Sequence, residues 1–279
     1  MDRIINIQMI ESFKNNLVEE EKSKCTVEKY VRDIRYFYRF AGGRVIDRAI
    51  VLEYKSELRK SYAVASANSM LAALNAFFHY VGYLDCCVKL FKIQRKVCSP
   101  EELELTRDEY LRLVKAAVDN GNERLSLILQ TICSTGIRVS ELKYITVESV
   151  TKGTVNVSCK GKNRMIFIVK QLKQLLLKYA KKRGIAEGEI FLTKNGNSIS
   201  RSSIWREMKA ICAKAKVSEK KVFPHNLRHL FARTFYKMEK DIAKLADILG
   251  HSNVNTTMIY IISTGAEHRR MMERMRMIV

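Results

Sequence analysis

Four side chains near the C-terminal end have the types and spacing needed to bind a phosphate ester and attack it. The segment P-H-N-L-R-H holds His225 and Arg228, three residues apart, and the segment L-G-H-S-N-V-N-T-T-M-I-Y holds His251 and Tyr260, nine residues apart. Arginine donates to two phosphate oxygens at once and keeps its proton, and histidine can donate to an oxygen or carry a proton. A phenol is a nucleophile. Together these residues favour attack by Tyr260 on a phosphodiester.

A further arginine, Arg138, lies far upstream in the segment T-G-I-R-V-S-E-L. Cleavage of a phosphodiester concentrates negative charge on the non-bridging oxygens in the transition state, and preorganised cationic donors must meet that charge in a partly dry site. We expect Arg138 and Arg228 to be those donors. A free phenol has a pKa of about 10, so Tyr260 attacks well only where cationic neighbours favour its phenolate form.

Local signals predict how these side chains are aimed. Pro224 is typical of the first position of a helix, and a helix that begins there places His225 and Arg228 on one face, because they are three residues apart. Gly250 can end the preceding helix as a C-terminal cap, which aims the following His251 inward. We therefore expect two helix ends to bring these side chains to one site.

With these segments the chain resembles the tyrosine recombinase (phage integrase) family. The motifs are specific over most of residues 104–279, and residues 1–97 match in outline. The resemblance implies that the arginines and histidines hold a scissile DNA phosphate while Tyr260 attacks it. A covalent 3′-phosphotyrosyl intermediate forms and a 5′-hydroxyl leaves. The bond energy is retained, so neither a cofactor nor a metal is implied, and the sequence has no P-loop and no credible acidic metal cluster.

The leaving 5′-oxygen needs a proton, and the resemblance gives this role to a lysine in a β-hairpin. Lys160, in C-K-G-K-N-R, stands just before a glycine as in the family pattern. Lys162 is the alternative, because an offset of two residues keeps it on the same strand face. Glu141 matches the acidic position that orients the active-site cations. The implied catalytic set is Arg138, Lys160, His225, Arg228, His251 and Tyr260.

The sequence departs from the family in its second arginine motif. The common pattern H-x-L-R-H-[ST]-F-A-[ST] reads H-N-L-R-H-L-F-A-R here, with Leu230 and Arg233 at the two variable positions. Neither change removes a catalytic group, but both can alter local packing or DNA contact. We interpret the remaining histidines, His79, His229 and His268, as structural residues.

The chain is strongly basic. Its 279 residues include 50 Lys and Arg against 29 Asp and Glu, a net charge of +21, of which +6 falls in residues 1–100 and +15 in the remainder. Such a charge on a folded chain indicates a polyanionic partner. Together with the resemblance, it favours double-stranded DNA over a small-molecule substrate.

Other features bear on the cellular setting. No apolar run has the length of about 18 residues that a membrane span needs, and the N-terminus lacks the apolar core of a signal peptide. We therefore expect a cytoplasmic protein that does not enter a membrane. The seven cysteines include no C-x-x-C pair, which favours reduced thiols over a disulfide framework or a zinc site.

Hydrophobic spacing predicts a mainly α-helical chain with a small antiparallel β-sheet. In the N-terminal part we expect four helices, near residues 10–17, 26–41, 47–60 and 66–81. Thr106 with Glu109 is a capping-box pattern that begins a later helix. Further helices are expected near residues 125–135, 171–182, 202–215, 225–238 and 241–249. Three β-rich runs predict the sheet, at residues 144–147, 154–158 and 165–169.

The organisation follows from these elements. The stretch 92–100 is basic, lacks periodicity and ends in proline, which is typical of an interdomain linker. We place a helical, SAM-like core-binding domain at 1–97, a linker at 98–103 and a mixed α/β tyrosine recombinase catalytic domain at 104–279. The resemblance implies that the first domain clamps DNA. The linker either lies along the DNA backbone or is a solvated connector.

The C-terminal residues carry an apolar stripe at helical spacing, formed by Met271, Met272, Met275, Ile278 and Val279. In relatives a terminal helix docks into a neighbouring subunit and links four protomers. The resemblance therefore implies an exchange helix and a homo-tetramer on two DNA sites. The alternative is that this helix packs onto its own domain.

The sequence thus favours a site-specific DNA recombinase or integrase that works through a Holliday junction, as a mobile-element integrase or a Xer-like resolvase. One alternative is a type IB topoisomerase-like nicking-closing enzyme, which the hairpin lysine and L-G-H motifs in a compact two-domain chain disfavour. The other is a catalytically idle DNA-binding or regulatory relative. Retention of all six polar positions argues against that reading.

Overall fold

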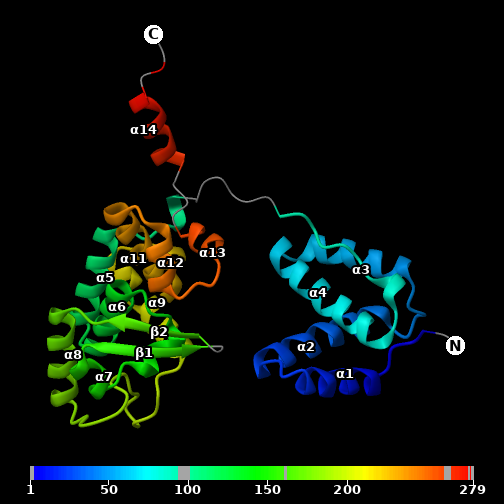
Figure 1. Ribbon diagram of the computed structural model, residues 1–279, viewed down its shortest axis with the longest axis horizontal. Coiled ribbons are helices and arrows are strands. Elements are labelled where there is room, and N and C mark those ends of the chain that lie inside the picture. The colour runs from blue at the N-terminus through cyan, green and yellow to red at the C-terminus, as the bar shows by residue number, and fades with distance from the viewer. Residues whose placement is uncertain (1–2, 94–100, 160–161, 261–264, 276, 278–279) are drawn as a thin grey trace. The chain divides into compact units, whose positions relative to one another are not determined.

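The computed structural model describes residues 3–93, 101–159, 162–260, 265–275 and 277 (Figure 1). The chain divides into two compact units, Met1–Arg95 and Lys96–Val279. The described residues are mainly helical and contain one two-stranded antiparallel sheet, which confirms the predicted fold class. Each helix in this part of the chain is too short or too polar to cross a membrane.

Helices make up the N-terminal unit, and α2 packs against the other three (Figure 1). Side chains at Asn6, Ser23 and Asp47 each accept a hydrogen bond from the backbone N–H three residues later, and so begin the first three helices. With Ser23 as its N-cap, the second helix starts at Lys24, slightly before the predicted position. The bounds are α1 Ile7–Glu19, α2 Lys24–Ala41, α3 Arg48–Ser61 and α4 Val64–Val81, with the 3₁₀ turn η1 Leu84–Cys86.

Aromatic rings fill the core of this unit. Phe37 lies 4.9 Å from Tyr54 and 5.9 Å from Phe78 between ring centroids, and Phe13 lies 5.3 Å from Phe77. These pairs are T-shaped, an arrangement that aromatic rings prefer over face-to-face stacking. Aromatic side chains from several helices therefore form much of this core.

The second unit, Lys96–Val279, holds the predicted catalytic residues and is called the catalytic unit below. It is built around helix α6, which packs against α5, α8, α9 and α11. Eight of its 13 residues are buried. The predicted capping box is confirmed, since Thr106 and Glu109 each accept from the other's backbone N–H at the start of α5. The helices are α5 Arg107–Asp119, α6 Glu123–Thr135, α7 Val147–Lys152, α8 Lys170–Lys182, α9 Arg201–Ala210, α10 Cys212–Ala215, α11 Pro224–Glu239, α12 Ile242–Leu249, α13 Val254–Met258 and α14 Gly265–Met275, with 3₁₀ turns η2 Glu101–Leu103, η3 Val139–Tyr144 and η4 Glu219–Lys221.

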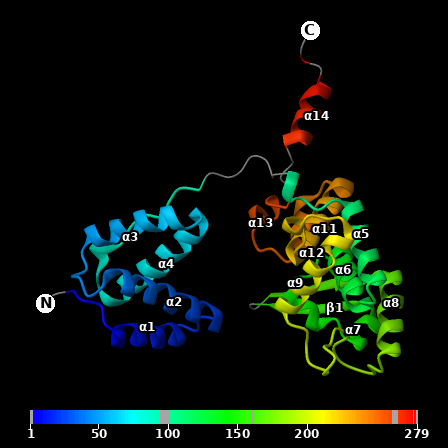
Figure 2. The same ribbon diagram turned by 180° about the vertical axis from the view of Figure 1, so that it is seen from behind.

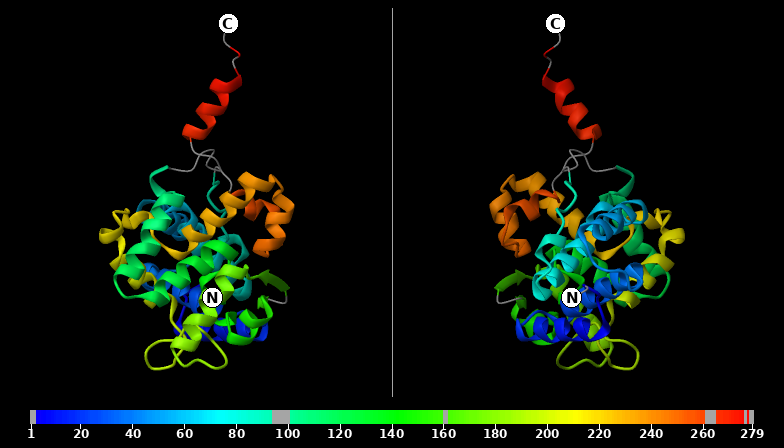
Figure 3. Two further views of the ribbon diagram at one scale, coloured as in Figure 1. Left: turned by 90° about the vertical axis from the view of Figure 1, so that its left-hand side faces the viewer. Right: turned by 90° about the vertical axis from the view of Figure 1, so that its right-hand side faces the viewer.

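The sheet consists of β1 Thr154–Cys159 and β2 Lys162–Phe167, paired antiparallel along their length. Side chains on one face, including Val155 and Ile166, are buried in the core, whereas Phe167 on the other face is 71% exposed. Helix α7 packs against both β1 and α8 (Figure 2). The short helices α12 and α13 (orange in Figure 3) also pack together, and α12 packs against α11.

The prediction of a strand at residues 144–147 is wrong. Tyr144 ends the turn η3 and Val147 begins α7. The cause is a second capping box, in which Thr146 Oγ1 accepts from the Ser149 N–H at 3.2 Å and Ser149 Oγ accepts from the Thr146 N–H at 2.9 Å. These local hydrogen bonds outweigh the β preference of the neighbouring side chains.

Two other segments differ in detail from the predictions. The single helix predicted for residues 202–215 is divided at Ile211 into α9 and α10. The predicted C-terminal helix begins at Gly265, before the apolar stripe, and the last residues of that stripe lie outside the described residues. Most of the predicted linker stretch 92–100 lies outside them as well.

Replacement of Gly136 by alanine should lower the unfolding free energy more than the same replacement at Gly153. Gly136 combines a left-handed backbone with a close neighbour. Its φ is +64°, and an added Cβ would lie 2.6 Å from Phe231 Cδ1. Gly153 is also left-handed, at +83°, but has open space around it. We expect Gly153→Ala to lower the unfolding free energy by about 1 kcal/mol and Gly136→Ala by at least about 1 kcal/mol more. Urea unfolding followed by the fluorescence of Trp205, the chain's single tryptophan, measures both, and equal losses would contradict the expectation.

Candidate active site

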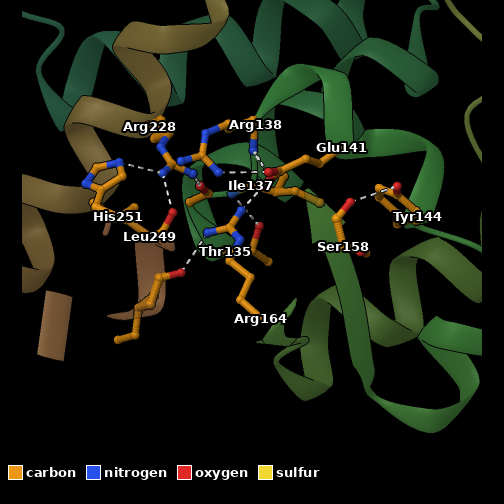
Figure 4. Close-up of polar contacts among 12 residues, drawn as sticks. Thr135, Ile137, Arg138, Glu141, Tyr144, Ser158, Arg164, Arg228, Leu249 and His251 are labelled. Atoms are coloured by element: carbon orange, nitrogen blue, oxygen red, sulfur yellow. Dashed lines mark hydrogen bonds and ion pairs between the residues drawn. The ribbon is translucent and has the colours of Figure 1, made fainter. Parts of the chain in front are cut away.

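Arg138 enters the site where α6 ends and the chain turns into η3. The carboxylate of Glu141, only 3% exposed, accepts from the Arg138 backbone N–H at 2.9 Å and from Nη1 at 2.8 Å (Figure 4). The Arg138 side chain stays 35% exposed. Glu141 therefore fixes this guanidinium while leaving part of it free to meet a substrate.

Arg228 is almost completely buried, at 1% exposure, and backbone carbonyls at the ends of two helices hold it. Its Nη1 donates to the carbonyl of Gly136 after α6, and its Nη2 donates at 2.7 Å to that of Leu249, the last residue of α12 (Figure 4). Helix C-termini favour positive charge. Burial, then the nearby Arg138, lowers the Arg228 pKa to about 10, which leaves the guanidinium charged at neutral pH.

His251 is held in one tautomer by two neighbours. Arg228 Nη2 lies 3.1 Å from Nε2, and because a guanidinium can only donate, Nε2 must accept. The proton then resides on Nδ1, which donates to Thr257 Oγ1 at 2.8 Å. Thr257 is fully buried in α13. Desolvation, followed by the charge of Arg228, lowers the His251 pKa to about 4, so the ring is neutral near pH 7.

Tyr260 is packed against three imidazole rings. Its ring centroid lies 4.3 Å from that of His229 and 5.3 Å from those of His225 and His251. The guanidinium carbon of Arg228 lies 6.0 Å from the same centroid. Tyr260 is 6% exposed. The candidate nucleophile therefore lies beside the most deeply buried arginine of the proposed set.

An open cleft of about 860 Å³ is lined by two neighbours of Tyr260, His225 and Arg228. Arg138, His225 and Arg228 line it together with Arg201 and Trp205 of α9. Trp205 is 51% exposed. The cleft therefore combines arginine and histidine donors with an exposed aromatic face, a combination suited to a phosphate and an adjoining nucleotide.

The ionisation of the neighbours follows from the same arrangement. Burial acts to raise the pKa of Glu141, but hydrogen bonds from Arg138 and the charge of Arg164 outweigh it, so the pKa is below its usual range. Partial desolvation, then the charge of Arg228, lowers the pKa of the cleft-lining His225. At neutral pH the site therefore holds ionised arginines, one carboxylate and neutral histidines.

The structure brings five of the six predicted residues into one site: Arg138, His225, Arg228, His251 and Tyr260. Lys160 lies outside the described residues. Lys162 begins β2, where its backbone pairs with Cys159. The predicted local geometry is also found, since Pro224 occupies the first turn of α11 and Gly250 ends α12 with a left-handed backbone.

Sequence reasoning missed three contacts of this site. His229 was interpreted as structural, yet its ring is the nearest of the three to Tyr260. Thr257 and Arg164 received no role, although they hold His251 and Glu141 respectively. Two motif positions gave a usable signal: His229 falls within H-N-L-R-H, and Thr257 within the segment that ends at Tyr260.

Leu230 and Arg233, the two residues that depart from the family pattern, both contact other residues of their own domain. Leu230 is buried in the core of the catalytic unit. Arg233 forms an ion pair with Glu104, in the segment just before α5, and both side chains are less than one-fifth exposed. These substitutions therefore alter packing within the domain.

Among the residues whose placement is described, no group of three or more His, Cys, Asp or Glu side chains is arranged to hold a metal ion. The carboxylate of Glu141 is already shared between Arg138 and Arg164.

The fold and the site together define a tyrosine recombinase. The chain belongs to the phage integrase family, whose model matches residues 104–267, and the model of the phage integrase N-terminal SAM-like domain matches residues 10–81. Tyrosine recombinase XerA of Pyrococcus horikoshii is 31% identical over 285 residues, which cover 99% of this chain and 96% of that protein.

Solved structures agree with this assignment. The crystal structure of XerA recombinase is 26% identical, with a TM-score of 0.55, and the match covers 98% of this chain and 99% of that one. A lambda integrase tetramer bound to a Holliday junction has a TM-score of 0.73 over 91% of this chain and 76% of that one. At 18% identity, the second comparison establishes a shared fold.

Acidification should destabilise the catalytic unit through two partly buried histidines. Burial lowers the pKa of both His229 and His251 to about 4, against about 6.5 in an unfolded chain. Between these values the unfolded chain binds more protons than the folded one, so the unfolding free energy falls as the pH drops through that window. We expect the thermal midpoint, followed by Trp205 fluorescence, to fall between pH 7 and pH 5, and to fall less in His229→Phe.

The control for this measurement is His79→Gln. His79 is exposed on α4 in the other unit, so its replacement should leave the pH dependence of the Trp205 signal as it is in the unchanged protein. A His229→Phe protein with the full pH dependence would show that His229 is not desolvated as described.

Proposed function

We propose that the protein is a site-specific DNA recombinase that cleaves and rejoins DNA through a covalent 3′-phosphotyrosyl intermediate. The observation that carries this proposal is the packing of Tyr260 against three imidazoles and beside Arg228, next to a cleft lined by Arg138 and His225. Cationic donors, neutral proton acceptors and a phenol nucleophile in one place are what metal-independent attack on a phosphodiester needs.

The phosphate would bind between the two arginines. Arg138 is partly exposed in the cleft and offers its guanidinium directly, with Glu141 holding it in place. Arg228 is held by carbonyls, and its Nη2 also contacts His251. Arrival of a phosphate oxygen would replace the Arg228–His251 contact, so that both side chains turn toward the anion.

Attack by Tyr260 requires removal of the phenol proton. His225 is neutral at pH 7, lies 5.3 Å from the Tyr260 ring between centroids, and faces the cleft. It is therefore suited to accept the proton as the Tyr260 oxygen bonds to phosphorus. The bond from phosphorus to the 5′-oxygen breaks in the same step.

The departing 5′-oxygen takes a proton from a lysine of the β1–β2 hairpin, which we assign to Lys160, with Lys162 as the alternative. A 5′-hydroxyl from another strand then attacks the phosphotyrosine and restores the phosphodiester. Because one ester replaces another at each step, no ATP is consumed. Two such exchanges on paired duplexes pass through a Holliday junction, as in a mobile-element integrase or a Xer-like resolvase.

The N-terminal unit is proposed to clamp the DNA. Along α2, the basic side chains Arg32, Arg35 and Arg39 line a groove of about 340 Å³ together with Lys14 of α1. Phosphate contacts from such residues give affinity that is independent of sequence and sensitive to salt. This surface suits the DNA backbone, while the catalytic unit holds the scissile phosphate.

The chemistry is tested with a nicked suicide substrate, made from a DNA site that the protein binds. Attack releases a short strand that cannot return, so a denaturant-stable protein–DNA adduct should accumulate. Tyr260→Phe should form none, because it lacks the phenol oxygen, while Tyr236→Phe, in α11, serves as the matched control. An adduct with Tyr260→Phe would overturn the nucleophile assignment. A bound site on which the unchanged protein forms no adduct would favour an idle DNA-binding protein.

The terminal helix α14 is proposed to dock into a neighbouring protomer in a homo-tetramer on two DNA sites. Met272 and Met275 of the apolar stripe are 68% and 61% exposed, so these two side chains do not pack within their own unit. Burial of such a stripe against another protomer would stabilise assembly.

Deletion of residues 268–279 should therefore weaken cooperative assembly on DNA by an order of magnitude or more and leave single-site binding nearly unchanged. Gel-shift titration with one-site and two-site DNA measures both. Thermal unfolding of the free protein, followed by Trp205, distinguishes the alternative, because packing of the helix on its own domain predicts a lower midpoint. Unchanged assembly and recombination would contradict docking between protomers.

A further inference from the structure

Arg164 in β2 joins three separate parts of the catalytic unit. Its side chain is 9% exposed, and Nη2 forms an ion pair with Glu141 of η3. Nη1 donates at 2.8 Å to the carbonyl of Ile248 in α12 (Figure 4). Arg164 does not line the catalytic cleft. The residue therefore lies behind the site and contacts the elements that form it.

The stem of Arg164 also packs against the chain just before His251. A Cβ added to Gly250 would lie 2.5 Å from Arg164 Cδ, and Gly250 has a φ of +65°. Glycine thus meets two requirements at this position, the left-handed turn that ends α12 and the close approach of the arginine stem. The direction in which the chain leaves α12 and reaches His251 depends on this contact.

The contacts of Arg164 with Glu141 and with the end of α12 lead to groups proposed to bind the phosphate. Glu141 uses one oxygen for Arg164 and the other for the Arg138 side chain. The end of α12 carries the Leu249 carbonyl that accepts from Arg228, followed two residues later by His251. A shift of Arg164 would therefore move the cations and the imidazole that meet the phosphate.

We infer that Arg164 is a positioning residue that sets the phosphate-binding groups, acting through Glu141 on Arg138 and through the end of α12 on His251. This inference rests on the proposed function. A planar guanidinium is required, because it reaches the carboxylate and the carbonyl with two different nitrogens, whereas a lysine has a single nitrogen for both. Burial keeps the fork in one orientation.

The test separates this role from folding and from proton donation by changing the substrate. In a methylphosphonate, a methyl group replaces one non-bridging oxygen, so the reacting group is neutral and depends less on cationic donors. In a 5′-bridging phosphorothiolate, the leaving thiolate needs no proton, so the substrate depends less on a general acid. Single-turnover formation of the covalent adduct is measured on both and on the ordinary phosphodiester.

Arg164→Met should form the adduct about 100-fold more slowly on the phosphodiester, the size of effect that a displacement of about 1 Å can produce. The deficit should shrink at least tenfold on the methylphosphonate and stay unchanged on the phosphorothiolate. Arg138→Ala should show the same pattern, and Lys160→Ala the opposite one. Arg164→Lys should fall between Arg164→Met and the unchanged protein on the phosphodiester.

Arg183→Met is the matched control, since Arg183 is an exposed arginine at the end of α8 and should keep the original rates. Trp205 fluorescence verifies that each variant is folded at the assay temperature. Relief of Arg164→Met by the phosphorothiolate would overturn the inference in favour of action through the hairpin lysine. Equal slowing on all three substrates, or none, would overturn it in favour of a purely structural role. Failure of the unchanged protein to form any adduct would instead refute the proposed function.

Discussion

The site depends on one buried positive charge, the guanidinium of Arg228. Removing such a charge from water costs several kcal/mol unless partners replace the lost hydration. Here the partners are the carbonyls of Gly136 and Leu249, with His251 as a third acceptor. The C-terminal ends of α6 and α12 must therefore both lie next to Arg228 in α11. Each of these helices ends at a glycine with a left-handed backbone, Gly136 and Gly250, which makes that approach possible.

Burial, together with this charge, also lowers the pKa of the surrounding histidines. Desolvation and the charge of Arg228 lower the pKa values of His225, His229 and His251, so these rings are neutral near pH 7. A neutral ring can accept a proton or pack as a flat surface against Tyr260, whereas three imidazolium ions beside two arginines would repel one another. Glu141 has the complementary role, because a single carboxylate holds Arg138 and Arg164.

Sequence could predict the parts of this arrangement that local signals encode. Helix caps, apolar stripes and the motifs around Arg228 and Tyr260 depend on residues a few positions apart, and the corresponding helices formed as expected. The β-branched residues at 144–147 predict a strand, but the capping box of Thr146 begins helix α7 there instead. Arg164 had no local signal, since its contacts lie 23 and 84 residues away.

The packing of Tyr260 has a consequence for when the site can react. Arg228 donates to backbone carbonyls and contacts His251, and Tyr260 is 6% exposed. A bound phosphate adds negative charge, which raises the pKa of nearby imidazoles and makes His225 a better proton acceptor. The same anion competes for the Arg228 hydrogen bonds that now go to His251. Under the proposed mechanism, the substrate would therefore supply charge that assists its own cleavage.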